Sequence, residues 1–138
     1  MSLFSIAGKR PFDLGVSKAG LGGCPGPPNC VSSNADRSCH HIAPFDPVID
    51  IETAWQEARE AVSALLRTRV VTDTGTYLHA ECRSKLFGFV DDLELHLCAD
   101  ENIIEVRSAS RLGHFDFKAN RERVERLRAL LRERGVVR

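Results

Sequence analysis

Residues 80 to 126 read AECRSKLFGFVDDLELHLCADENIIEVRSASRLGHFDFKANRERVER, and this stretch decides the fold of the 138-residue chain. Its first half alternates apolar and polar residues, the period expected of β-strands that bury one side. Leu93, Leu95 and Leu97 form the apolar side of one such segment. The second half ends in a basic amphipathic segment. The stretch therefore predicts strands followed by a helix.

Two neighbouring segments show the same alternation. Leu78, Ala80 and Cys82 share one side before this strand, and Ile104 and Val106 share one side after it. The links between the segments, KLFGF and ADEN, are too short for the crossover that a parallel pair of strands requires. The pattern therefore predicts an antiparallel meander, and residues 69–72 are a further candidate strand.

Two helices are predicted on either side of the meander. Residues 50–69 carry an apolar stripe at three- and four-residue steps, with Asp50 as a plausible N-cap. The stripe consists of Ile51, Ala54, Trp55, Ala58, Val62, Leu65 and Leu66. Asp116 is the expected N-cap of a final helix that ends at Gly135. The apolar face of this helix is expected to contain Phe117, Val124, Leu127, Leu130 and Leu131.

The length fits a single domain. Residues 1–46 are rich in Gly, Pro, Ser and Asn and predict an irregular N-terminal arm that wraps a domain formed by residues 47–138. Residues 39–43 are expected to add a short edge strand. The predicted fold class is α+β, a two-layer sandwich with two helices on one sheet face and an open polar second face. The arm is expected to dock through Phe4, Ile6, Phe12, Leu14, Val16 and Leu21.

Charge gives little guidance on partners, because the formal net charge is zero. Residues 118–138 hold eight basic and three acidic side chains, which indicates a basic helix beside a more acidic sheet. Nucleic-acid binding by this helix is not expected, since stacking aromatic residues are missing nearby and glutamates interrupt the arginines. No apolar run reaches the ~20 residues of a membrane span. No secretory signal precedes the domain, so the expected location is cytoplasmic.

A register for the first hairpin can be proposed from its pattern. If the turn is centred between Phe87 and Gly88, apolar residues pair with apolar ones, and a slip of one residue would destroy this match. Shifts of two residues preserve it. The register would group His79, Glu81, Glu94 and His96 on the open polar face. Such a set suits zinc, but a solvated face with Arg107 paired to Glu94 is the favoured interpretation. We therefore predict no metal and no cofactor.

Three motifs resemble the bacterial and plastid family called domain of unknown function 1499. They are CPGPPNCVSS at residues 24–33, FVDDLE at residues 89–94 and VRSASRLGHFDFKANRERVE at residues 106–125. The resemblance implies a fold and a set of unusual residues, and it implies no activity. His114 and Phe115 stand where the family usually has other residues. Relatives often carry an export signal or a membrane segment, which this sequence lacks.

The resemblance is densest in a cluster of arginine, serine and acidic residues. Arginine binds carboxylates and phosphates with two hydrogen bonds at once. The cluster could therefore be a pocket for a small anionic ligand, or an internal ion-pair network, which is the favoured of the two interpretations. The candidate ligand-binding residues are Arg83, Asp91, Asp92, Arg107, Ser108, Ser110, Arg111, Asn120 and Arg121.

Cys24 and Cys30 flank PGPPN and belong to the family motif. In an exported protein a disulfide would be the first expectation, whereas in a reducing cytosol the pair would remain thiols or switch between the two states. Both alternatives stay open at the level of sequence.

The function expected from these features is a non-catalytic binding or scaffold domain. Its arginine-rich cluster would serve a small anionic ligand or a protein partner. The alternative is an enzyme that uses the same cluster with His79, His96 or His114 as proton carrier. No nucleophile–base pair or phosphate-binding loop supports the enzyme, so no catalytic residue is predicted.

Overall fold

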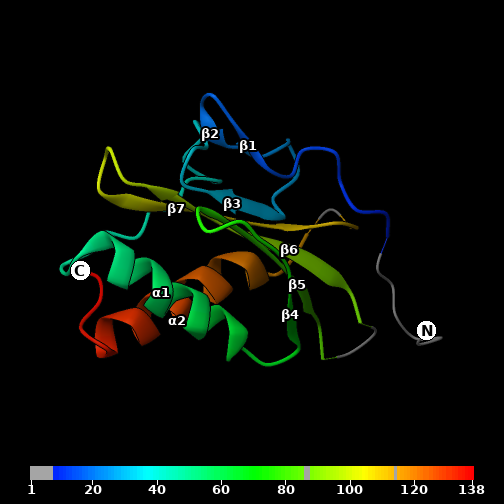
Figure 1. The fold of residues 1–138 in the computed structure, drawn as a ribbon. Coiled ribbons are helices and arrows are strands. Elements are labelled where there is room, and N and C mark those ends of the chain that lie inside the picture. Colours follow the sequence, from blue (N-terminus) through cyan, green and yellow to red (C-terminus); the bar gives the residue numbers. More distant parts are fainter. Residues whose placement is uncertain (1–7, 86–87, 114) are drawn as a thin grey trace.

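A computed structural model describes residues 8–85, 88–113 and 115–138, and within these residues it confirms the predicted α+β sandwich. A five-stranded antiparallel sheet has the strand order β3-β7-β6-β5-β4. Helices α1 and α2 cover one face, and a small β1–β2 hairpin lies over the other (Figure 1). The strands are β1 (Val16–Ser17), β2 (Gly20–Leu21), β3 (Cys30–Ser32), β4 (Thr68–Asp73), β5 (Tyr77–Arg83), β6 (Val90–Cys98) and β7 (Ile103–Ser110).

The predicted alternation of the sheet is correct, but its first register is shifted by two residues. Leu78 pairs with Leu95, and Glu81 pairs with Asp92. A shift of two preserves which side chains share a face, so the apolar sides predicted for β5, β6 and β7 are retained. Arg107 lies directly across from Glu94, as expected for a cross-strand ion pair.

Helix α1 (Ile51–Ser63) starts as predicted and ends earlier than residue 69. The Asp50 carboxylate caps it by accepting a hydrogen bond from the Thr53 amide at 3.1 Å. After the helix, Arg67 adopts a left-handed conformation with φ 53°, and β4 begins at the next residue. Leu66 is therefore outside the helix and 78% exposed, so its placement in the apolar stripe was wrong.

With Asp116 as its N-cap, the last helix would begin at residue 117. Helix α2 (Ala119–Glu133) begins two residues later. The Asp116 carboxylate nevertheless accepts hydrogen bonds from the amides of Lys118 and Asn120, at 2.9 and 3.2 Å. Phe117 precedes the helix in a left-handed conformation and is almost fully exposed. Its predicted place in the apolar face was wrong.

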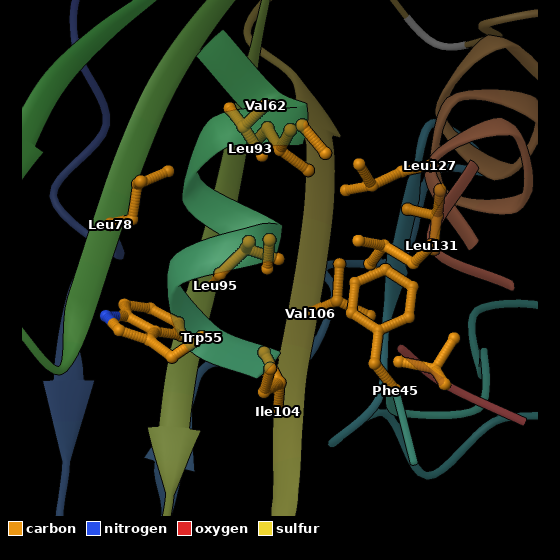
Figure 2. Close-up of a cluster of buried hydrophobic side chains, with 14 of the residues drawn as sticks. Phe45, Trp55, Val62, Leu78, Leu93, Leu95, Ile104, Val106, Leu127 and Leu131 are labelled. Carbon is orange, nitrogen blue, oxygen red and sulfur yellow. The ribbon is translucent and has the colours of Figure 1, made fainter. Parts of the chain in front are cut away.

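The core lies between the sheet and the two helices (Figure 2). Residues from the sheet, both helices and the arm contribute to it. Phe45 and Ile42 join it from the segment before α1, so the arm and the rest of the chain share one core. The side chains labelled in Figure 2 are Phe45, Trp55, Val62, Leu78, Leu93, Leu95, Ile104, Val106, Leu127 and Leu131.

The N-terminal arm is more regular than predicted. Its edge strand is β3, paired with β7, whereas the predicted strand at residues 39–43 is reduced to one bridge between Ser32 and His41. Leu21 is buried as expected, but Phe12 and Val16 are exposed, so apolar docking by these two residues was wrong. Phe4 and Ile6 lie outside the described residues. Residues 10–21 of the arm also form hydrogen bonds with carboxylates of the sheet.

Candidate functional site

The polar face of the sheet is covered by the arm, and the prediction of an open, solvated face was wrong. Glu94 is 0% exposed and Arg107 is 1% exposed. We call the polar side chains of this face the buried charged layer. The layer consists of His79, Glu81, Asp92, Glu94, His96, Glu105, Arg107 and Arg111.

Arg107 joins the layer to the arm. One Nη of its guanidinium group donates to Glu94 at 3.3 Å, and the other donates to Asp13 of the arm at 2.8 Å. Its Nε donates to the Gly23 carbonyl at 2.9 Å. Glu94 also accepts hydrogen bonds from the Gly15 amide and the Tyr77 hydroxyl, at 2.8 and 2.6 Å. All three guanidinium nitrogens of Arg107 and both carboxylate oxygens of Glu94 therefore have hydrogen-bond partners within the chain.

Arg111 forms the second centre of the layer. It binds Asp92 through two hydrogen bonds of 2.8 Å and also contacts Glu81. Glu81 further accepts hydrogen bonds from Arg10 and Arg69, at 2.9 and 3.0 Å. Burial alone would raise the pKa of Glu81, but the arginine hydrogen bonds outweigh it and lower the pKa to about 2. Asp92 likewise has a lowered pKa, since hydrogen bonds from Arg111 and His79 outweigh its burial.

Both arginines of the buried charged layer are already bound by carboxylates, so neither is open to an added anion. The zinc site considered from the sequence is also not formed. Within the described ranges, the ligand atoms of His79, Glu81, Glu94 and His96 do not gather around one point. His79 instead bonds to Asp92 at 2.6 Å, and Glu94 is engaged by Arg107.

The β1–β2 hairpin approaches the layer closely at Gly20. A Cβ atom at this position would lie 2.5 Å from the Glu105 carboxylate, and φ is +92°. Gly20→Ala combines this clash with left-handed strain, so we expect it to destabilise the protein by about 2–3 kcal/mol. Urea unfolding measures the effect. Gly75→Ala is the matched control, because φ is +91° there and the added Cβ meets open space. Equal losses in the two variants would contradict close docking of the hairpin.

Other predicted site residues lie on the opposite, helix-facing side of the sheet. The Ser108 hydroxyl donates to the Asn120 side chain at 2.7 Å, and Asn120 donates to Ser110 at 2.9 Å. Arg123 binds Asp91 at 2.8 Å and donates to both Ser108 and Asn120. These contacts fix the start of α2 on β7. Arg123 was missing from the predicted set, although its position one turn after Asn120 places both on one helix face.

The structure therefore divides the nine predicted residues among separate settings, and their role in ligand binding stays a prediction. Asp92, Arg107 and Arg111 belong to the buried charged layer. Arg121 instead donates to the backbone carbonyls of Cys39 and His41, at 3.3 and 3.0 Å. Arg83 is exposed at the end of β5. The separation arises because side chains alternate between sheet faces, so neighbours in sequence lie on opposite sides.

Arg83 lines a cavity of about 360 Å³ at the end of the sheet, between the end of α1 and the start of α2. We call it the arginine cavity. Its polar lining consists of Arg67, Arg83, Arg123 and Arg126 together with Thr68 and Cys82. Among the described residues, none that lines it is acidic. Asp91, bound to Arg123, is the nearby counter-charge.

The cysteines occupy three different settings. Cys24 and Cys30 form a disulfide with a Cα–Cα distance of 5.7 Å, and Cys30 is the first residue of β3. Disulfides are typical of oxidising compartments and rare in the cytosol, so the cytoplasmic location stays a prediction. Cys82, at the arginine cavity, is buried, and burial raises the pKa of its thiol. A neutral buried thiol is a poor nucleophile. Cys39 and Cys98 are also free thiols.

Across the ranges that the structure describes, no helix has both the length and the apolar character needed to cross a membrane.

The fold and its charged layer define a two-layer α+β domain whose second sheet face is sealed by an N-terminal arm. The chain belongs to the family described as "Protein of unknown function (DUF1499)", whose model matches residues 20–131. This confirms the family resemblance of the sequence motifs. No solved structure gives a significant match to the chain.

One curated relative is 1-aminocyclopropane-1-carboxylate synthase 6 of Arabidopsis thaliana, which is 31% identical over 94 residues. The matched segment is 65% of this chain and 18% of that protein. The chain thus spans less than one fifth of the relative's length.

Proposed function

We propose that this protein is a non-catalytic binding domain for a small anionic ligand, and that the arginine cavity is its site. The observation that carries the proposal is the lining of the cavity by four arginines without an acidic side chain among the described residues. This proposal moves the expected anion site away from Arg107 and Arg111, which are already bound by carboxylates. Arg83 is the residue common to both sites.

Charge supports the proposal. One of the four arginines, Arg123, is balanced by Asp91, whereas among the described residues no carboxylate forms an ion pair with Arg67 or Arg126. The carboxyl-terminal end of α1, at Ala64, adds a partial negative charge of roughly one half. The two guanidinium groups of Arg67 and Arg126 exceed that charge. Their planar forks match the oxygen geometry of carboxylate and phosphate groups.

Size and chemistry agree with a small ligand. A volume of about 360 Å³ lies near the lower end of the range for small-molecule sites, which is about 300–1,000 Å³. The Thr68 side chain adds a hydroxyl to the lining, and Leu65 and Leu66 add an apolar wall. Such a site would hold a compact anion with a small apolar part.

The non-catalytic character rests on the groups nearby. The Cys82 thiol has a raised pKa and is neutral near pH 7. Among the proposed proton carriers, His79 is 3% exposed with its Nε2 bonded to Asp92, on the opposite side of the sheet from the helices. His114 lies outside the described residues. The activity in the name of the Arabidopsis relative is not transferred, because the match covers so little of that protein.

Calorimetric titration with inorganic phosphate, citrate and a phosphorylated sugar tests the proposal. We expect saturable binding of at least one of these anions that weakens with added salt. Arg126→Gln should reduce the affinity about 10-fold or more, because one charged hydrogen bond contributes about 1.5–3 kcal/mol.

Arg132→Gln is the matched control, since Arg132 is also exposed on α2 but does not line the cavity. It should bind like the unmodified protein. No binding of any tested anion, or equal losses in the two variants, would refute the arginine cavity as the site.

A further inference from the structure

Three metal-binding side chains meet at the edge of the buried charged layer. His96 and Cys98 lie two residues apart on β6 and therefore share one face, and Glu105 on β7 is the direct cross-strand partner of His96. His96 Nδ1 lies 2.8 Å from Glu105 Oε1 and 3.3 Å from Cys98 Sγ. One ligand atom from each residue falls within 4.8 Å of the other two. Among the described residues, this is the one group of three or more such side chains whose ligand atoms lie close enough to hold a metal ion.

The arm fixes the carboxylate of this cluster. Glu105 Oε1 accepts a hydrogen bond from the Leu21 amide at 3.1 Å, and Oε2 accepts one from the Asn34 side chain at 2.9 Å. Metal-binding carboxylates are commonly held by such outer hydrogen bonds, which set their orientation. Gly20 leaves room for the carboxylate where any larger residue would clash with it.

We propose that His96, Cys98 and Glu105 bind a zinc ion through Nδ1, Sγ and an Oε atom. A set of one nitrogen, one sulfur and one oxygen ligand suits zinc, which accepts all three in tetrahedral sites. Ligands at about 2.0–2.3 Å from zinc lie roughly 3–4 Å apart. The two distances from His96 Nδ1, 2.8 Å to Glu105 and 3.3 Å to Cys98, are therefore close to those a zinc ion would require. Three protein ligands leave a fourth position for water.

The surroundings also favour a cation. The layer next to the site contains more carboxylates than arginines, and Glu101 and Asp100 follow Cys98 in the turn. The His96 side chain is 19% exposed, which leaves a path from solvent. Binding releases the Sγ proton of Cys98 to solvent and requires that Nδ1 of His96 carry no proton, so the imidazole proton lies on Nε2 in the complex, without any change of oxidation state.

Cobalt(II), a spectroscopic substitute for zinc, tests the site in the full chain with its free thiols reduced. We expect one equivalent to give the visible bands of tetrahedral cobalt and a near-ultraviolet thiolate-to-cobalt charge-transfer band. Zinc should abolish both when it is added. A cobalt spectrum without the thiolate band, or no binding of either ion at micromolar concentration, overturns the proposal.

Variants assign the ligands. Cys98→Ser should remove the thiolate band and lower the zinc affinity by more than about 100-fold. This loss exceeds the roughly 10–100-fold that is typical when a residue that only hydrogen-bonds to a metal ligand is removed. Asn34→Ala should lower the zinc affinity by about 10–100-fold while the thiolate band remains. Cys39→Ser replaces an exposed free cysteine and should change neither. If Cys98→Ser keeps its affinity, or Cys39→Ser loses it equally, the site is wrong. The spectrum of the unmodified protein remains decisive even if a variant does not fold.

Discussion

Arg107→Met is expected to destabilise the protein by about 3–5 kcal/mol, the usual loss when one partner of a buried ion pair is removed. The substitution leaves Glu94 fully buried with only the Tyr77 hydroxyl and the Gly15 amide as partners. It also removes the link from β7 to Asp13 and Gly23 of the arm. Equilibrium urea unfolding, monitored by circular dichroism, measures the change in the free energy of unfolding.

Two further variants make this result specific. Arg107→Met combined with Glu94→Gln should recover part of the loss, because the second change removes the unpaired charge. Arg59→Met is the control, since Arg59 pairs with Asp73 in a half-exposed setting and should contribute less than about 1 kcal/mol. A loss of under 1 kcal/mol for Arg107→Met would mean that the buried charged layer does not hold the arm to the sheet.

Acid should destabilise the protein strongly between roughly pH 4.5 and pH 2. In the folded state the pKa of Glu81 is lowered from its ordinary 4.5 to about 2. The unfolded chain therefore binds the proton first as the pH falls, and the stability that ionised Glu81 provides is lost across this interval. Glu81 alone accounts for about 3 kcal/mol. Asp92 and Glu105, whose pKa values are also lowered, should add to the loss.

Unfolding free energies at a series of pH values check this expectation. Glu81→Gln should flatten the dependence of stability on pH in this interval, because the titrating carboxylate is absent. Glu60→Gln, on the exposed side of α1, is the control and should keep the slope. A protein whose stability stays constant from pH 5 to pH 2 would contradict the ionised network.

Period-two alternation was sufficient to predict the sheet, because it fixes which side chains share a face regardless of exact register. It could not fix the register itself, since a shift of two residues leaves every apolar pair intact. The end of α1 was missed for a different reason. Leu65 and Leu66 continue the helical spacing, but the chain turns at Arg67 and β4 follows with its β-branched residues.

The candidate site was harder to predict because its contacts are long-range. Alternating charged residues look the same whether solvent or an arm covers them, and the Arg107–Asp13 contact joins residues 94 positions apart. The sequence held one signal that the arm covers this face. Acidic and arginine residues are matched on it, and the arm has glycines at positions 20, 22 and 23. Arg67 and Arg126 were missed because they are far apart in sequence. Arg67 fell inside the first predicted helix, and Arg126 fell on the basic face of the last one.

The central claim is that the arginines of this domain divide between two tasks. Arg107 and Arg111 hold the arm through internal carboxylates, and we propose that Arg67 and Arg126 of the arginine cavity bind a ligand. The most direct measurement is an amide chemical-shift titration of the isotopically labelled protein with phosphate. We expect saturable shifts confined to residues 64–68, 82–83 and 119–126 around the arginine cavity. Saturable shifts centred on Arg107, Arg111 and the arm, with the cavity unchanged, would contradict the account.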